Sequence, residues 1–589
     1  MFEYCVTVES GFDVDDPGVS AASEWDLGSA HWFGGGEEIP QKWPLETYDN
    51  LTHSLVTQEA RNRGIQDPFW FNSDGLYIFV HPGAPLFVSI NPADNKGKLV
   101  LTSRVTSPYR PRPGGFLTKI TSCKTANAKE AFQLAVENHL GKPTGYPDEL
   151  MIRYPVWSTW AQYKSFISDV IVREFAKEIK DHGFTNSQLE IDDAWETCYG
   201  SKEVDKTRFP DMKKLTDDLK AEGFRVTIWT HPFINEDCTE TLNEANSQGF
   251  LVKDMNGSIK TKWWNGNGSI VDFTKKDAQT WFINKHKAMM EANGIDGFKF
   301  DAGETSWNPQ LPALNIPSDR SEDYPNLATQ MYVETCSTFN NLTEVRSAYR
   351  TQKLPIFVRM IDKDSRWGDD NGLKSLVTTL LQMNMVGYSM VLPDMIGGNQ
   401  YGSDVATKEL FVRWLQANVF MPALQYALVP WNYDVESNET VQLSQKFNDL
   451  HAKFTPIVIK AMKKNIEDGS PVNPPIWWLD PTDENALKES TEFLLGEEIL
   501  SAPILEENQG KRDIYLPKGS WKDGNTLKLY DGPMTIKDYE APLSVLPYFV
   551  IVGSDADKIL DPQSTGGAAS CTAPVTIPTV LFLLLSLLR

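Results

Sequence analysis

At 589 residues the chain is too long for one hydrophobic core, so two to four domains are expected. Hydrophobic residues make up 41% of it, which excludes a disordered protein. The formal net charge of -23 would repel phosphate backbones and anionic headgroups, so we expect no nucleic-acid partner and a neutral substrate.

Residues 1–150 have the pattern of an N-terminal β-sandwich. Short runs of alternating apolar and polar residues, such as 77–80, 86–90 and 98–102, are separated by Gly, Pro and Asn. No segment of helical periodicity appears before about Ala126.

Residues 151–480 predict a catalytic (β/α)8 TIM barrel, so the fold class is α/β. Helical stretches, such as Phe166 to His182 with Phe166 and Val170 on its apolar side, alternate with short apolar strands. The strand candidates are Gln188–Ile191, Arg225–Trp229, Gly297–Phe300, Pro355–Val358 and Tyr388–Leu392. Roughly 300 residues of βα units suit a closed barrel. The alternative, an open doubly wound sheet, is expected to show an early Gly-rich phosphate turn, and none is seen.

Strand patterns return in residues 481–560, which predict a smaller C-terminal β-domain. Residues 561–589 resemble a GPI-attachment signal: small residues at 564–570, a short spacer and an apolar tail. The alternative, a tail-anchored helix, is disfavoured by Pro578 and by the lack of a basic cluster. We therefore expect entry into the secretory pathway and a lipid-anchored protein at the cell surface, or an extracellular one.

The first residues do not fit that destination. They contain neither the basic start nor the apolar core of a signal peptide, so we expect the N-terminus to be truncated.

Carboxylates follow four of the predicted barrel strands. They lie in the segments 189–195, 297–304, 357–362 and 391–394, and a further pair, Asp369 and Asp370, lies between the last two. A single strand-end Asp often caps the next helix. Four such clusters at the C-terminal face of one barrel predict a carboxylate-lined pocket.

Within 297–301, strand alternation places Lys299 and Asp301 on the same side. A nearby ammonium would keep Asp301 ionised, as a nucleophile requires, although a buried ion pair without function has the same pattern. Glycoside cleavage needs a second, protonated carboxyl group. Crowding by like charge would raise the pKa of one member of the Asp369–Asp370 pair, and the pattern alone does not say which.

These motifs resemble glycoside hydrolase family 31. Residues 299–304 are similar to its nucleophile motif, 367–371 to its acid/base motif, 387–398 to the following strand with Asp-Ile-Gly-Gly, and 493–521 to the start of its C-terminal β-domain. The resemblance implies a retaining glycosidase with Asp301 as nucleophile and Asp370 as general acid/base.

Within that family the chain most resembles the myogenesis-regulating glycosidase group, on residues 31–37, 361–365 and 372–376. That resemblance implies hydrolysis of terminal α-linked galactose. Glucosidase members carry an Arg-x-His segment where this chain reads Pro422 to Gln425, which argues against glucose. An α-glucosidase on the same scaffold, a transglycosylase and a non-catalytic cell-surface sugar-binding protein stay as alternatives.

We expect the remaining substrate-binding residues to come from the strand ends and from aromatic residues near them. Asp192 and Asp193 are similar to the paired carboxylates with which α-galactosidases bind sugar hydroxyls, although they could instead cap a helix. Further candidates, each of which could instead be structural, are Trp195, Trp229, Trp264, Lys299, Arg359 and Asp394.

The six cysteines show no zinc-ligand spacing, so no metal is expected, and the reaction needs no organic cofactor. Cys198 and Cys238 follow the ends of neighbouring strands and are the favoured disulfide, although connectivity cannot be deduced from sequence. The expected partners are an oligosaccharide or glycoconjugate substrate and a membrane, through the lipid anchor. A homodimer is left open.

Overall fold

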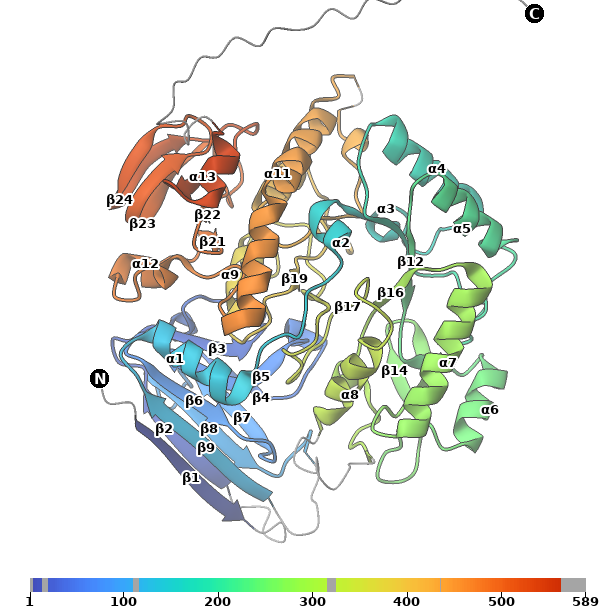
Figure 1. The fold of residues 1–589 in the computed structure, drawn as a ribbon. Coiled ribbons are helices and arrows are strands. Elements are labelled where there is room, and N and C mark those ends of the chain that lie inside the picture. Colours follow the sequence, from blue (N-terminus) through green and yellow to red (C-terminus); the bar gives the residue numbers. More distant parts are fainter. Residues whose placement is uncertain (1–3, 13–19, 110–115, 315–324, 435, 563–589) are drawn as a thin grey trace, which may run out of the picture.

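The computed structural model describes residues 4–12, 20–109, 116–314, 325–434 and 436–562. Two antiparallel sheets at the N-terminus lie beside a barrel, and a third antiparallel sheet near the C-terminus lies across a long helix from it (Figure 1). This is the architecture expected from the sequence.

The N-terminal region is a sandwich of a five-stranded sheet, in the order β1-β9-β6-β5-β3, and a four-stranded sheet, in the order β2-β8-β7-β4. Its strands are β1 (Tyr4–Phe12), β2 (Ser20–Asp26), β3 (Trp32–Gly36), β4 (Leu51–Ser54), β5 (Gln66–Asn72), β6 (Leu76–Val80), β7 (Leu86–Ile90), β8 (Lys98–Arg104) and β9 (Phe116–Lys124). Alternate residues such as Trp70, Ile78 and Leu101 form an apolar core within it.

The barrel consists of eight parallel strands in the order β19-β18-β17-β16-β12-β11-β10-β20. They are β10 (Val156–Ser158), β11 (Gln188–Ile191), β12 (Val226–Thr230), β16 (Gly297–Phe300), β17 (Glu344–Val345), β18 (Phe357–Arg359), β19 (Val391–Leu392) and β20 (Gln425–Tyr426). A parallel bridge between Met395 and Gln425 closes the ring. β10, β17 and β20, which have two or three residues each, were not among the predicted strands.

Helices α1 to α13 connect or flank the sheets. They are α1 (Ala128–Ala135), α2 (Glu149–Arg153), α3 (Trp160–Tyr163), α4 (Asp169–Asp181), α5 (Met212–Ala221), α6 (Thr239–Ser247), α7 (Lys276–Asn293), α8 (Leu327–Cys336), α9 (Leu373–Asn384), α10 (Lys408–Asn418), α11 (Glu439–Asp468), α12 (Glu484–Lys488) and α13 (Asp555–Leu560). None of the helices in the described part of the chain is long and apolar enough to cross a bilayer.

Helix α4 begins three residues later than its apolar pattern predicted. The Ser168 side chain accepts a hydrogen bond from the backbone N–H of Ile171 and so fixes the helix start. Phe175 and Ile179 face the core, whereas Phe166 and Val170 are exposed. The prediction that the latter two lie on the buried side was wrong.

A small sheet is inserted after β12, with β15 (Gly266–Ile270) between β13 (Phe233–Asn235) and β14 (Thr261–Trp263). Its β14–β15 turn carries Trp264 towards the catalytic face of the barrel. The C-terminal sheet has the order β21-β22-β25-β23-β24, with β21 (Phe493–Leu495), β22 (Ile499–Ser501), β23 (Lys511–Asp523), β24 (Leu529–Glu540) and β25 (Tyr548–Ile551).

Two disulfides link parts of the fold. Cys198–Cys238 joins the segments that follow β11 and β12, as predicted, and Cys5–Cys123 joins β1 to β9. Cys571 and the predicted attachment signal lie outside the described residues, except for 561 and 562.

Candidate active site

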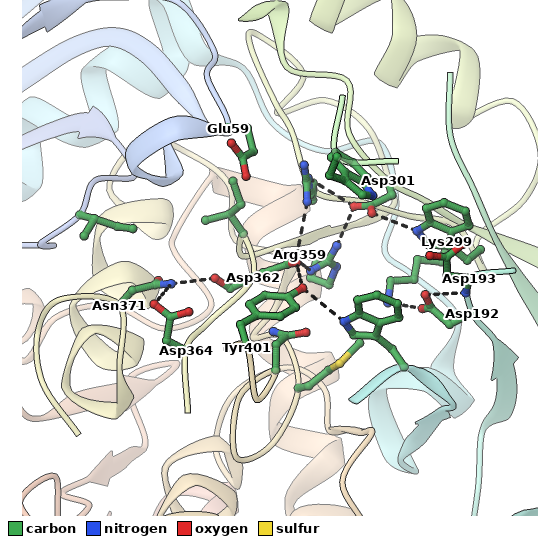
Figure 2. Close-up of a pocket in the computed structure, with 18 residues that line it drawn as sticks. Glu59, Asp192, Asp193, Lys299, Asp301, Arg359, Asp362, Asp364, Asn371 and Tyr401 are labelled. Carbon is green, nitrogen blue, oxygen red and sulfur yellow. Dashed lines mark hydrogen bonds and ion pairs between the residues drawn. The ribbon is translucent and has the colours of Figure 1, made fainter. Parts of the chain in front are cut away.

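A cavity of about 430 Å³ lies at the carboxyl ends of the barrel strands. Carboxylates and arginines from several strands converge in it, and Figure 2 shows Asp301 and Arg359 between Asp192 on one side and Asp362 on the other. This volume lies in the range of small-ligand sites. Its position is where the sequence predicted a carboxylate-lined pocket.

Asp301 directly follows β16 and is 7% exposed. Its Oδ2 accepts a hydrogen bond of 2.9 Å from the Trp229 indole, and its Oδ1 contacts Arg359 Nη2 at 3.0 Å and Arg346 Nε at 3.3 Å. Burial acts to raise the pKa of Asp301, but Arg346 and Arg359 outweigh it and hold that pKa below its ordinary value. Asp301 is therefore an ionised carboxylate with one face turned to the cavity.

The backbone around Asp301 turns sharply out of the strand. Ala302 has φ 59° and Gly303 φ 95°, both in the left-handed region. A Cβ on Gly303 would lie 2.4 Å from Tyr332, whose hydroxyl donates to the Asp301 carbonyl at 2.8 Å. Glycine at 303 thus allows the packing that fixes the nucleophile's backbone.

Two arginines connect the carboxylates of the site. Arg359, at the end of β18, contacts Asp394 at 3.0 Å, Asp362 at 2.8 Å and Glu344 at 3.4 Å in addition to Asp301. Because it binds several acids at once, Arg359 is a fixed cation in the wall of the cavity.

Arg346, one residue after β17, is a site residue that the sequence analysis missed. Glu304 holds it through Nε at 2.8 Å and Nη2 at 3.5 Å, and its guanidinium lies 4.9 Å from the centroid of the Trp264 ring. Glu304 also accepts from the Trp307 indole at 2.8 Å. The two-residue strand before Arg346 left no periodic signal by which it could have been found.

The second carboxylate of the site is Asp362. Its Oδ1 contacts Arg359 Nη1 at 2.8 Å and Arg346 Nη1 at 3.7 Å, and its Oδ2 accepts from the Tyr401 hydroxyl. Burial acts to raise its pKa, but both arginines and the hydrogen bonds lower it well below the ordinary value. Asp301 and Asp362 therefore share both guanidinium groups inside one cavity.

Asp370, the predicted acid/base, is not among the residues that line this cavity. Its side chain is 57% exposed and its carboxylate contacts Arg366 Nη1 at 3.1 Å, whereas the next residue, Asn371, does line the cavity. The structure therefore does not pair Asp370 with Asp301. The loop after β18 instead brings Asp362 into the cavity, a residue that the sequence analysis included only as the end of the carboxylate-bearing segment 357–362.

Asp192 and Asp193, which follow β11, both line the cavity. Lys299 Nζ lies 2.9 Å from Asp192 and 3.2 Å from Glu190, so its direct partners are these two acids and not Asp301, as we had expected. Lys299 lowers the pKa of Asp301 less than the arginines do. The predicted cavity-facing side of β16 is confirmed, but the role expected for Lys299 is taken by Arg346 and Arg359.

Asp193 has a different environment. Its Oδ1 accepts from the Tyr199 hydroxyl at 2.8 Å and its Oδ2 from Asn265 at 3.3 Å. Burial, opposed by these hydrogen bonds, raises the pKa of Asp193 to about 6. Asp193 is therefore a carboxylate that changes its protonation near neutral pH.

The other predicted residues divide into two groups. Trp229 and Trp264 line the cavity, and Trp264 is 41% exposed, so it can offer a ring face to a sugar. Trp195 is fully buried with its indole donating to the Trp229 carbonyl, and Asp394 is fully buried against Arg359, so neither lines the cavity. Trp195 therefore positions Trp229, and Asp394 positions Arg359, without lining the cavity themselves.

Several lining residues come from parts of the chain that carried no motif. Ile39 and Glu59 belong to the N-terminal region, and Trp160 and Tyr401 to segments after β10 and β19. The other lining residues are Arg346 and Asn399, which lay in no quoted motif, and Ile361, Asp362, Asp364, Asn371 and Met395, which lay in quoted segments but were not named as site residues. Among the described residues no group of three or more His, Cys, Asp or Glu is arranged to hold a metal ion.

Three sequence-family profiles match the chain. They are the glycosyl hydrolases family 31 TIM-barrel domain over residues 153–461, the family 31 C-terminal domain over 469–554, and the myogenesis-regulating glycosidase N-terminal domain over 12–120.

Relatives and solved structures agree with these profiles. The mouse myogenesis-regulating glycosidase is 33% identical over 541 residues, which cover 88% of this chain and 74% of that protein. The SITS-binding protein of Tetronarce californica is 26% identical, with the same coverage of both chains. The fold superposes on a soil-metagenome family 31 α-xylosidase with a TM-score of 0.79 at 21% identity, covering 94% of this chain and 82% of that one.

Two observations agree. The barrel strand ends bring ionised Asp301 and a second carboxylate into one cavity, and the family profile matches more than half of the chain. The chain belongs to glycoside hydrolase family 31, the O-glycosyl hydrolases with a TIM-barrel catalytic domain.

Proposed function

We propose that this protein is a retaining, exo-acting α-glycosidase that removes terminal α-linked galactose from an oligosaccharide or glycoconjugate, with Asp301 as nucleophile and Asp362 as general acid/base. One observation carries the proposal: Asp301 and Asp362 contact the same two guanidinium groups, those of Arg346 and Arg359, inside one cavity. Retaining glycosidases need two carboxyl groups close enough to act on one bond, about 5–5.5 Å apart.

In the first step Asp301 attacks the anomeric carbon and an ester bond forms as the glycosidic bond breaks. Asp362 gives its proton to the departing oxygen from its protonated form, which is the minor form in the unliganded site because Arg359 and Arg346 lower its pKa. Arg346 and Arg359 keep Asp301 ionised and ready to attack, and the Trp229 indole fixes its other oxygen.

In the second step Asp362 takes a proton from water, whose oxygen attacks the anomeric carbon. The ester bond breaks and its electron pair returns to the Asp301 carboxylate, which releases the sugar with its original configuration. Arg359 and Arg346 favour the ionised form of Asp362 that this step requires.

We prefer Asp362 to Asp370 as the proton donor because a general acid must reach the leaving oxygen directly or through one water. Asp362 lines the cavity, whereas the Asp370 side chain points to Arg366 and is largely in solvent.

The low exposure of the lining residues Asp192 and Lys299, 2% and 3%, supports exo action on the end of a glycan. Support for galactose comes from the resemblance to the myogenesis-regulating glycosidase group and from Asp192 and Asp193, which can accept hydrogen bonds from sugar hydroxyls. An α-glucosidase on the same scaffold is the enzyme alternative.

The test is release of 4-nitrophenol from the paired α-galactoside and α-glucoside by the purified protein and by Asp301→Ala. We expect galactoside turnover that the substitution lowers on the order of 10⁴-fold, with retained configuration of the first product seen by NMR. Turnover of the glucoside alone would overturn the choice of sugar. A folded protein that binds galactose but turns over neither substrate would favour the sugar-binding alternative.

We also propose that the enzyme acts in the secretory pathway or at the cell surface, held by a C-terminal GPI anchor. The disulfides Cys5–Cys123 and Cys198–Cys238 support an oxidising compartment. Release of the protein from intact cells by a phosphatidylinositol-specific phospholipase C is the expected result. Retention on the cells after that treatment would contradict the anchor.

A further inference from the structure

Tyr401 links the proposed acid/base to a neighbouring loop through a directed chain of hydrogen bonds. The Trp160 indole N–H donates to the Tyr401 hydroxyl oxygen at 3.3 Å, and the Tyr401 hydroxyl contacts Asp362 Oδ2. An indole N–H can only donate, and a phenol has a single proton. The Tyr401 proton therefore points to Asp362, as the dashed lines in Figure 2 trace.

The Tyr401 ring is held in this position from one side. Lys164 Nζ lies 4.9 Å from the centroids of both the Trp160 and Tyr401 rings and donates to the Asn399 carbonyl. The two rings meet edge to face with centroids 6.4 Å apart. Segments after β10 and β19 thus fix the hydroxyl that faces Asp362.

We infer that Tyr401 is a positioning residue for the acid/base: its hydroxyl holds the Asp362 carboxylate in the orientation from which Asp362 takes a proton from water in the second step. This inference rests on the proposed function, in which Asp362 is the acid/base. The inference extends the proposed function by assigning Tyr401 to the second step. Tyr401 contacts Asp362, whereas Arg346 and Arg359 contact both Asp301 and Asp362.

The charges around Asp362 come from several elements. Arg359 and Arg346 favour its ionised form from β18 and the end of β17, and Asp301 and Asp394 oppose it from β16 and β19. The farther charged groups are Lys164 after α3, Glu59 of the N-terminal region and Glu304 after β16.

Tyr401 is a neutral donor to Asp362, whereas Arg346 and Arg359 are charged. Burial, with the nearby Asp362 charge, raises the pKa of Tyr401 well above its ordinary value, so it keeps its proton at any working pH. Removing its hydroxyl therefore destabilises the ionised form of Asp362 relative to the protonated form, without changing the charge of the site.

The test compares Tyr401→Phe with Tyr163→Phe, which removes a phenol hydroxyl from α3 while leaving the Asp362 contact in place. With 4-nitrophenyl α-galactoside, whose leaving group needs little acid help, we expect Tyr401→Phe to slow hydrolysis of the glycosyl-enzyme about tenfold or more. A burst of 4-nitrophenol should then precede a slower steady state, with kcat and KM falling together.

For a galactoside with an alkyl leaving group, the same substitution should move the alkaline limb of kcat/KM to higher pH, because Asp362 holds its proton more tightly. Tyr163→Phe should leave the burst and the limb unchanged. A Tyr401→Phe enzyme with an unmoved alkaline limb, no burst and only a raised KM would overturn the inference and make Tyr401 a wall of the cavity.

A second measurement separates this inference from the proposed function. Binding of a galactose-configured iminosugar, a basic probe that needs no turnover, is followed by calorimetry against pH in the wild type and in Tyr401→Phe. A pH dependence shifted upwards in the variant supports the hydrogen bond to Asp362 even if no glycoside is cleaved, and superimposable curves refute it. Loss of turnover in the wild type would refute the proposed function alone.

Discussion

The carboxylates at the strand ends and those in the loop after β18 are built differently. Asp192 and Asp301, after β11 and β16, are 2% and 7% exposed, and each contacts a buried cation. In the loop, Asp362 is 26% exposed at the side chain and Asp370 57%. Charge pairs weaken as solvent screens them, so an Asp at a buried strand end, one at a partly exposed loop position and one at the surface have different electrostatic environments.

The difference also shows what holds each group. Strand ends fix their side chains by the geometry of the barrel, whereas the loop residues depend on side-chain contacts such as Lys42–Asp369 and Arg366–Asp404. Asp362, the proposed proton donor, lies in this loop. The expected effects of substitution therefore differ between the two regions.

The comparison is tested most strongly by Asp362→Asn against Asp370→Asn. Removing a positioned acid/base costs typically 10²–10⁴-fold in rate, so we expect that range for Asp362→Asn on an alkyl α-galactoside. Asp370→Asn should cost less than about tenfold, since it removes an exposed ion pair with Arg366. Steady-state kinetics on the two variants and on the wild type measures both effects.

Azide provides the control for this pair. With an activated substrate, azide should restore the rate of Asp362→Asn and give α-galactosyl azide, because the glycosyl-enzyme still forms and needs no base for the attack. If Asp370→Asn shows the larger loss and the azide rescue, Asp370 is the proton donor and the loop must move when substrate binds.

This contrast explains how much could be predicted from the sequence. The barrel, its flanking β-regions, Asp192, Asp193 and Asp301 follow from strands long enough to show alternation, which fixes side-chain direction. Asp362 and Asp370 are eight residues apart in a segment without regular structure, and no local rule says which one faces the cavity.

Arg346 and Tyr401 show a second reason why part of the site could not be predicted from the sequence. Arg346 is placed by a two-residue strand and by Glu304, and Tyr401 by Lys164 from a distant loop. Their positions depend on contacts between segments far apart in the chain, which a single sequence does not reveal. Glu304, in contrast, was part of the recognised motif, although its partner was not.

A smaller but still large effect is expected from Glu304→Gln. This change removes the charge-assisted contact that orients Arg346, and hydrogen bonds to charged groups are worth about 1.5–3 kcal/mol. We expect kcat/KM on the galactoside to fall about tenfold or more, with most of the loss in kcat because Arg346 contacts both carboxylates.

The matched control is Glu334→Gln on α8. Glu334 does not line the cavity, and its Oε1 lies 3.4 Å from Lys353 Nζ. It should leave kcat/KM within about twofold of the wild type. Equal losses in the two variants would mean that Glu304 acts on overall stability and not on Arg346.

The smallest effect concerns Asp193 and pH. Its pKa is raised to about 6, so as pH falls from 7 to 5 it gains a proton and loses its charge, which weakens the hydrogen bonds that it can accept from a sugar hydroxyl. KM should therefore rise several-fold over that range while kcat follows Asp362. In Asp193→Asn the KM should be high and flat across the same range, and a KM that still varies with pH would assign the titration to another group.

Stability provides an independent measurement of the same group. Because the folded-state pKa of Asp193 lies above the ordinary value of 3.8, the folded protein binds its proton more tightly than the unfolded chain does. Its burial therefore destabilises the fold above pH 6, and this penalty fades as pH falls towards 4. Asp193→Asn should raise the Tm relative to the wild type at pH 7 and lose that advantage at pH 4, which would show that ionised Asp193 lowers the stability of the fold near neutral pH.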